Sequence, residues 1–313
     1  MRFAPAGVVA AAALACAAAV TACGFGAGPS SGGTATLTVT RDYGSRALVE
    51  ATESDPPASE TVIRLLDGNA DIATRYGGGF VQSIDGLAGT GSSDWFFYVN
   101  GVESPVGSAD VQVRGGDRIW WDYRNWSAAM SVPAVVGSWP EPFAQASADR
   151  PRPVPVECLG VRPACETTSR RLAAIGAKAP ISFGGRGGST GGPRVVVGPW
   201  ARVRGAPGVD ELGGSPASDG VFATFKGPAS GGWHLIGLDE AGHPAHDFGP
   251  GGGLVAALRG TGGEPTWIVT GSGGPAVRRA AAALDPGSLR DRYAIAATPE
   301  APVPLPIVSG GGE

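Results

Sequence analysis

One serine has the surroundings expected of a nucleophile. Ser272 stands in Thr270-Gly271-Ser272-Gly273-Gly274, after a strand pattern and before a helix pattern. The turn lacks the G-x-S-x-G spacing of a nucleophile elbow, and no residue is identifiable from the sequence as its base. Helix entry is the alternative role, because Ser and Gly are favoured just before a helix that starts with Pro275. We therefore assign no catalytic residue and expect a non-enzymatic protein, with a hydrolase in the C-terminal region as an alternative.

Three histidines share a Gly- and Pro-rich segment with acidic residues: His234, Asp239, Glu240, His243, His246 and Asp247. These residue types bind metals. Their spacing, however, matches no closed pattern of zinc ligands. We expect no metal site and no cofactor from this segment.

The N-terminus has the pattern of a bacterial export signal. Arg2 precedes an Ala-rich apolar run from Ala4 to Val20, which is short for a spanning helix of roughly 20 strongly apolar residues. Val20-Thr21-Ala22-Cys23 follows and resembles the lipobox of bacterial lipoproteins. The resemblance implies a signal peptide at 1–22 and a diacylglycerol on the Cys23 thiol, and two acyl chains give stable anchoring. Cleavage without lipid, which would release a free secreted protein, is the alternative.

The next residues fit an anchored protein on the outer face of the cell membrane. Residues 23–33 are rich in Gly and Ser and are expected to form a flexible tether. The close pair Cys158 and Cys165 is most simply a disulfide outside the cytoplasm. Net charge is −4 and no basic run occurs, so nucleic acid is not an expected partner.

Aromatic residues concentrate between Trp95 and Trp139. If 118–123 is a strand, Arg118, Trp120 and Asp122 share one face, and the apolar residues between them share the other. Trp120 on the polar face is either a stacking platform for a flat or partly apolar ligand, or a contact beneath a second domain. We take the ligand-binding candidates to be Trp95, Phe96, Tyr98, Asn100, Trp120 and Tyr123.

Residues 34–126 carry the elements that would position these side chains. Strand patterns occur at 35–40, 77–84, 95–99 and 118–123, and a short helix pattern occurs at 61–66. Asp94-Trp95-Phe96-Phe97-Tyr98-Val99-Asn100-Gly101, followed by Gly116-Asp117-Arg118-Ile119-Trp120-Trp121-Asp122-Tyr123, resembles the DUF4430 domain. That domain is similar to the C-terminal β-domain of transcobalamin and intrinsic factor. The resemblance implies a β-grasp-like mixed sheet on one helix, and cobalamin as a bound ligand.

A second domain is expected after a Pro-rich connector at 127–155. Residues 156–306 contain strand patterns, including two similar hairpins at 220–236 and 253–270 that we interpret as two pieces of one sheet. Two helices are expected, at 167–175 and 275–284. The predicted fold class is therefore α+β: the β-grasp-like domain, then a mixed α/β domain with about two helices, and a flexible tail at 307–313.

Three functions follow from these features. The leading hypothesis is a non-enzymatic surface lipoprotein that binds a ligand or partner and captures cobalamin or another corrinoid for uptake. The sequence has no helical barrel like that of the B12 carriers, so a vitamin-uptake transporter or a helical-barrel protein is the expected partner. The first alternative is a module that docks another envelope protein. The second is the hydrolase considered above.

Overall fold

A computed structural model describes residues 32–144, 152–184, 191–209, 212–228, 232–260 and 263–308. The predicted signal peptide, Cys23, most of the tether, residues 185–190 and the end of the tail lie outside the described residues. Strands hold 38% of the described residues and helices 18%. The predicted α+β class is therefore wrong, because this part of the chain is mainly β, with four sheets and six short helices.

Two features explain that error. Strands form where the sequence gives a weak signal: β2 is an edge strand, and Glu50, Thr52 and Ser54 on it are exposed. Several helices are also single turns of four residues, which contribute little helix to the whole. Only α3 and α6, among the described residues, exceed two turns.

The first sheet has the strand order β2-β1-β8-β6-β7. Its strands are β1 (Thr34–Arg41), β2 (Arg46–Ser54), β6 (Ser93–Val99), β7 (Val102–Glu103) and β8 (Arg118–Asn125). β1 pairs in parallel with β8 and antiparallel with β2, and β6 pairs antiparallel with β8. One face of this sheet packs on helix α1 (Val62–Asp67), which buries Val62, Leu65 and Leu66 against Leu37 and Ile119.

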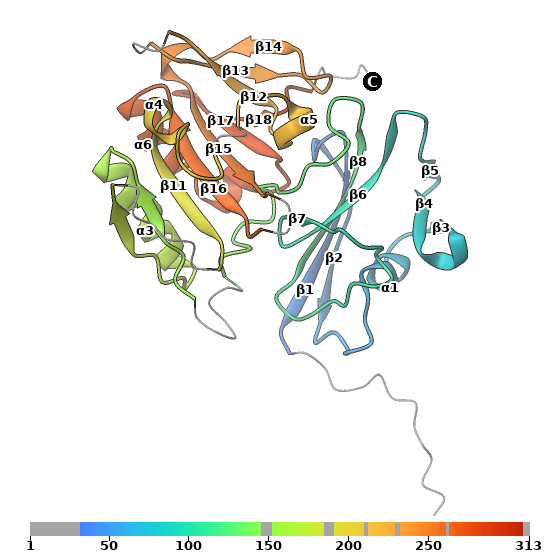
Figure 1. Cartoon of the computed structure of the whole chain (residues 1–313). Helices are drawn as coiled ribbons and strands as arrows, with labels where there is room; N and C mark the ends of the chain where they lie inside the picture. The colour runs from blue at the N-terminus through green and yellow to red at the C-terminus, as the bar shows by residue number, and fades with distance from the viewer. Residues whose placement is uncertain are drawn as a thin grey trace, which may run out of the picture.

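A small sheet lies beyond the first one, on the side away from the rest of the chain (Figure 1). It contains β3 (Ile72–Arg75), β4 (Phe80–Ile84) and β5 (Leu87–Ala88), with the 3₁₀ turn η1 (Tyr76–Gly78) between β3 and β4. Val81 and Ile84 of β4 are buried in the same apolar cluster as α1. The small sheet is thus attached to the core of the first sheet.

The second region is built on a seven-stranded sheet with the order β10-β9-β11-β16-β15-β17-β18. Its strands are β9 (Val156–Cys158), β10 (Ile181–Phe183), β11 (Arg194–Pro199), β15 (Gly253–Leu258), β16 (Thr266–Gly271), β17 (Ala294–Ala297) and β18 (Pro302–Leu305). The four strands from β10 to β16 are parallel, and the remaining pairs are antiparallel. Near-continuous apolar runs such as Val195-Val196-Val197 fit a sheet that is covered on both faces.

Each face of this sheet has its own cover. Helices α3 (Arg162–Ala174) and α6 (Gly274–Ala282) bury Leu172 and Val277 on one face, together with Val195 and Val197. On the other face lie α4 (Trp200–Val203) and a sheet of β12 (Ala223–Lys226), β13 (His234–Leu238) and β14 (Pro244–Asp247). The single-turn helix α5 (Pro216–Asp219) comes shortly before β12 in the chain. The turn η2 (Gly249–Gly251) and the short helix α7 (Pro286–Leu289) complete the described elements.

The two similar hairpins do not belong to one sheet. β12 and β13 lie in the three-stranded sheet, whereas β15 and β16 lie in the seven-stranded sheet. That interpretation was wrong because both hairpins alternate apolar residues in the same way, and the pattern cannot show which layer each one joins.

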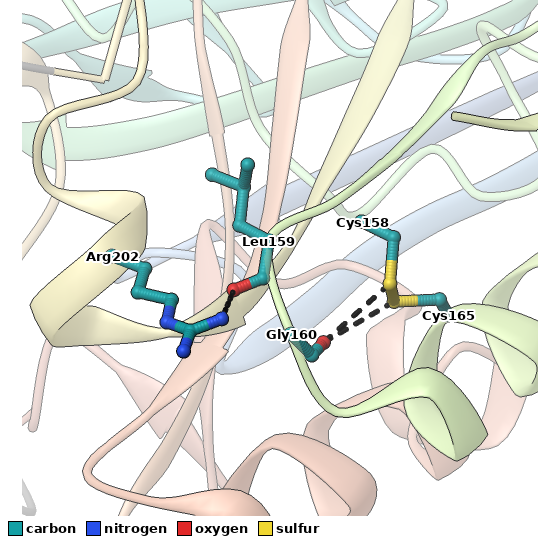
Figure 2. The surroundings of a disulfide bond; sticks show 5 residues. All are labelled: Cys158, Leu159, Gly160, Cys165 and Arg202. Atoms are coloured by element: carbon teal, nitrogen blue, oxygen red, sulfur yellow. Dashed lines mark hydrogen bonds between the residues drawn. A yellow bond between two sulfur atoms is a disulfide. The ribbon is translucent and has the colours of Figure 1, made fainter. Parts of the chain in front are cut away.

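The predicted disulfide is present. Cys158 at the end of β9 bonds to Cys165 in the first turns of α3. Figure 2 shows the Gly160 carbonyl oxygen close to both sulfur atoms, at 3.5 and 3.4 Å, and the Arg202 guanidinium donating to the Leu159 carbonyl oxygen. Closing so short a loop should stabilise the fold by about 2.5 kcal/mol in the chain-entropy estimate.

The predicted connector, 127–155, is described in most of its length and packs into the protein. Val132 and Val135 are buried beside the first sheet, and Trp139 and Phe143 contact Trp267 of the second region. No helix among the described residues is long and apolar enough to cross a membrane. The domain boundaries themselves stay a prediction.

Candidate functional site

Alternate residues of β6 and β8 point to opposite sides of the first sheet, and each side has a different environment. Ile119 and Trp121 of β8 pack with α1, whereas Trp120 between them packs with Tyr98 and Tyr293. We call the side without α1 the outer face. From the register, its rows are Thr52-Thr36-Arg118, then Glu50-Thr38-Trp120-Tyr98, then Thr40-Asp122-Phe96.

The last two rows of the outer face are largely closed by the second region. Tyr293, just before β17, packs edge-on against Trp120 and Tyr98, with ring centroids 5.2 and 5.8 Å away. Tyr43 packs edge-on against Tyr293, and Trp120 and Tyr98 are 2% and 0% exposed. We call the group Tyr43, Tyr98, Trp120, Asp122 and Tyr293 the sealed cluster.

Hydrogen bonds join the sealed cluster across 171 residues of sequence. The Tyr98 hydroxyl donates to the Tyr293 hydroxyl at 3.3 Å, and Tyr293 donates to Asp122 Oδ2 at 2.9 Å. Thr40 donates to Asp122 Oδ1 at 2.6 Å while it accepts from Trp120 Nε1 at 2.8 Å. The Gly44 backbone N–H also donates to Asp122. These donors satisfy a carboxylate that has no salt bridge to a described residue.

Burial controls the electrostatics of the sealed cluster. Desolvation raises the pKa of Asp122 to about 6, although its hydrogen bonds from Thr40, Gly44 and Tyr293 act in the opposite direction. Desolvation likewise raises the pKa of Tyr43 to about 12 and that of Tyr293 well above its ordinary value. Tyr43 and Tyr293 therefore stay protonated near pH 7, and the observed contacts of the cluster are those of an interface.

Phe96 lies beside a buried cation. The Arg124 guanidinium stands 3.7 Å from the centre of the Phe96 ring and donates to the carbonyl oxygens of Ala129 and Met130. Arg124 is 1% exposed. One face of Phe96 is therefore occupied by the protein itself.

Asn100 and Tyr123 have structural contacts. Asn100 has a φ of 55° in the β6–β7 turn, and its side chain donates to Asp117 Oδ1 and accepts from the Arg118 N–H. Tyr123 donates its hydroxyl to the Ala88 carbonyl oxygen and packs edge-on against Trp95. Both residues hold the shape of the first sheet.

An aromatic pocket of about 250 Å³ lies between β4, β6 and the segment that follows β7. We call it the open pocket, and its lining includes Phe80, Trp95, Phe96, Phe97, Val106 and Trp121. Trp95 and Phe96 are two of the predicted ligand-binding residues, whereas Tyr98, Asn100, Trp120 and Tyr123 do not line it. The structure thus places Trp95 and Phe96 at a pocket, Tyr98 and Trp120 in a buried interface, and Asn100 and Tyr123 in neither.

Large apolar side chains are exposed around this pocket. Phe80 and Val106 are 42% and 51% exposed, and Tyr76, which packs edge-on against Phe80, is 87% exposed. Water-exposed aromatic residues that gather beside a concave, apolar surface mark an interaction site. Sequence reasoning missed Phe80 and Val106 because they lie on separate segments of the chain. The local signal was an aromatic residue, Phe80, directly after the run of three glycines at 77–79.

Ser272 and the histidines do not form a catalytic group in the described residues. The Ser272 hydroxyl donates to the carbonyl oxygens of Gly249 and Gly252. His234 Nδ1 lies 3.1 Å from Asp247, and the His246 ring packs on Phe248. No group of three or more metal-ligating side chains occurs in the described part of the chain.

Comparison with known proteins gives one domain family and a weak likeness to a solved structure. No curated protein matches the chain. A solved structure from Ruminococcus gnavus, described as a "putative metal binding protein", is 14% identical; the match covers 30% of this chain and 97% of that one, with a TM-score of 0.24. Residues 59–125 match the family described as "Domain of unknown function (DUF4430)". They span α1 through β8, so the chain carries a DUF4430 domain that includes the open pocket.

Proposed function

We propose that this protein is a non-enzymatic binding protein, anchored to the outer face of the cell membrane through Cys23, whose DUF4430 domain holds a ligand in the open pocket. One observation carries the proposal: exposed aromatic and apolar side chains surround an aromatic-lined hollow within the family match. Such a surface favours a flat or apolar group, since apolar area removed from water contributes about 25 cal/mol per Å².

A corrinoid is the specific ligand that the resemblance to the B12 carriers supports. A hollow of about 250 Å³ lies below the roughly 300–1,000 Å³ of small-molecule sites, so it would hold one peripheral group of so large a molecule. Trp120 is not a contact in this version of the proposal, because Tyr293 covers it. The other face of the ligand would meet a helical-barrel protein or an uptake transporter.

Equilibrium dialysis of the full-length protein against cyanocobalamin tests the corrinoid proposal. We expect micromolar binding that Phe80→Ala weakens about tenfold, since burying a Phe side chain contributes roughly 1.5–3 kcal/mol. Phe183→Ala is the matched control, because Phe183 is also exposed but lies on β10 of the second region. Equal affinity in both variants, or no binding at all, would rule out a corrinoid in the open pocket.

Docking of an envelope protein is the second candidate, and the exposure of Tyr76 favours it. A side chain that is 87% exposed contributes little to the fold, and its position beside Phe80 extends the apolar surface beyond the pocket. Cross-linking in intact cells from a photoreactive residue at position 76 would distinguish the candidates. A discrete protein adduct at 76, absent when the same group is placed at 183, supports docking; no adduct at 76 contradicts it.

Membrane anchoring has its own test. We expect the wild-type chain to fractionate with membranes and to incorporate radiolabelled palmitate, and Cys23→Ser to lose both properties. Cys16→Ser is the matched control in the same N-terminal segment and should retain both. A Cys23→Ser protein that stays with the membrane would refute the anchor while leaving the pocket proposal intact.

A further inference from the structure

The first row of the outer face and most of the second row border another cavity, of about 260 Å³, between the first sheet and the second region. Thr36, Thr38, Thr52 and Arg118 line it from the sheet side. Gly137, Ser138, Arg290 and Asp291 line it from the opposite side. We call this cavity the cleft; it is separate from the open pocket, which lies on other residues.

Every charged side chain that lines the cleft forms a salt bridge to a described residue, except Arg118. Arg290 contacts Glu50 at 2.9 Å and Asp291 at 3.5 Å, so both acidic side chains already have a cationic partner. The half-buried Arg118 makes no side-chain hydrogen bond and no salt bridge to a described residue, although its charge acts weakly on Asp291. A guanidinium has five N–H donors in a fork that matches carboxylate and phosphate oxygens. Arg118 therefore offers unused donors to the cleft.

Hydroxyl groups add to this surplus. Ser138 is 3% exposed, and its hydroxyl has no hydrogen-bond partner among the described residues. The hydroxyls of Thr36, Thr38 and Thr52 make no side-chain hydrogen bond to a described residue either. The three threonine hydroxyls are accessible to a ligand in the cleft, whereas the Ser138 oxygen is too deeply buried to contact one.

The walls of the cleft are fixed by close backbone contacts. A Cβ atom at Gly137 would lie 2.7 Å from both the Arg292 nitrogen and a Trp120 ring carbon. The Asp291 N–H donates to the Gly137 carbonyl oxygen. The two sides are thus held together at Trp120, and the cleft is a preformed cavity beside that contact.

We infer that the cleft binds a small hydroxylated organic anion. Its carboxylate or phosphate would accept hydrogen bonds from the N–H donors of Arg118, and its hydroxyls would bond to the threonines. The paired acids Glu50 and Asp291 supply acceptors for ligand hydroxyls and restrict the ligand to a single anionic group. The cavity size fits a molecule no larger than a monosaccharide acid.

Isothermal titration calorimetry of the full-length protein tests this inference with four probes: glucuronate and glycerol 3-phosphate as anions, and glucose and glycerol as their neutral counterparts. We expect at least one anion to bind and neither neutral compound to do so. The tighter anion identifies the ligand group as a carboxylate or a phosphate. Arg118→Gln should weaken that anion about tenfold or more, and Arg46→Gln, which changes an exposed arginine on β2, should leave the affinity unchanged.

Thr38→Val provides a second measurement that preserves shape and removes one hydroxyl, with the exposed Thr34→Val as its control. We expect the affinity for the anion to fall about threefold or more in Thr38→Val and to stay unchanged in Thr34→Val.

Thermal unfolding checks that each variant folds. If Arg118→Gln does not fold, the comparison of Thr38→Val with Thr34→Val tests the inference. Equal binding of glucose and glucuronate, no binding of either anion at millimolar concentration, or unchanged affinity in the folded variants would overturn the inference. Phe80→Ala should not affect this binding, which separates it from the open pocket.

Discussion

The sealed cluster and the open pocket are built from neighbouring residues of the same two strands, yet one is closed by the protein and the other faces water. Tyr98 and Trp120 point to the outer face and meet Tyr293, whereas Trp95 and Trp121 belong to the opposite side. The pocket side also carries the exposed Phe80 and Val106. Aromatic residues in this domain therefore serve two purposes: those that contact Tyr293 belong to the interface, and those beside β4 line the open pocket.

The largest effect is expected where the sealed cluster depends on glycine. Gly44 has a φ of 74°, and a Cβ atom there would lie 1.9 Å from the Asp291 carbonyl oxygen. Gly44→Ala should therefore lower the free energy of unfolding by about 3 kcal/mol or more. Gly86→Ala separates backbone strain from contact, because Gly86 has a similar φ of 79° with nothing within 4 Å; about 1 kcal/mol is expected there. Equal losses in denaturant titrations would mean that the two regions are not in close contact at Gly44.

The next largest effect is expected on the pH dependence of stability, through Asp122 of the sealed cluster. The pKa of Asp122 is raised to about 6 in the folded protein, against an ordinary value of about 3.9 when unfolded. Between these values the folded state binds more protons, so the free energy of unfolding should fall as pH rises from about 4 to 6, by roughly 2–3 kcal/mol. Asp122→Asn should flatten this slope. An unchanged slope in chemical denaturation of that variant would remove Asp122 as its source.

Removing one hydroxyl from the sealed cluster should have a smaller effect. Tyr293→Phe takes away the donor to Asp122 Oδ2 and the acceptor for Tyr98, and should cost about 1–2 kcal/mol. The pKa of Asp122 should rise further, because that hydrogen bond lowers it. Tyr123→Phe is the control, since its hydroxyl bonds to Ala88 at an exposed site. A cost for Tyr123→Phe as large as that for Tyr293→Phe would contradict the comparison.

The open pocket should show the smallest effect on stability. Phe80→Ala should lower the free energy of unfolding by at most about 1 kcal/mol, because the ring is 42% exposed. Phe222→Ala, on a 1% exposed ring that packs against Tyr43, should cost about 3–5 kcal/mol. Thermal unfolding of the two variants makes the comparison directly. Similar losses would show that the pocket aromatics are part of the core.

Local pattern predicted β6 and β8, which carry the aromatic residues, and also β1 and α1, which pack with them. It also placed Trp120 on the polar face of β8, away from Trp121. It could not predict Tyr293, because a partner 171 residues away leaves no trace in the spacing of β8. Phe80 and Val106 were missed for the same reason: a pocket made by three separate segments has no local period. The balance of strand and helix was wrong because edge strands such as β2 have little apolar alternation.

The parallel pairing of β1 with β8 has a practical consequence for recombinant work. The family match begins at residue 59, after β1, although β1 lies between β2 and β8 in the sheet. A fragment cut to 59–125 would leave β8 with an unpaired edge and Trp120 without its bond to Thr40. A fragment of 32–126 would restore the sheet but expose Tyr98, Trp120 and Asp122 to water. Insoluble inclusion bodies are the expected outcome for the shorter piece, and residues 32–308 are the smallest span that keeps every contact described above.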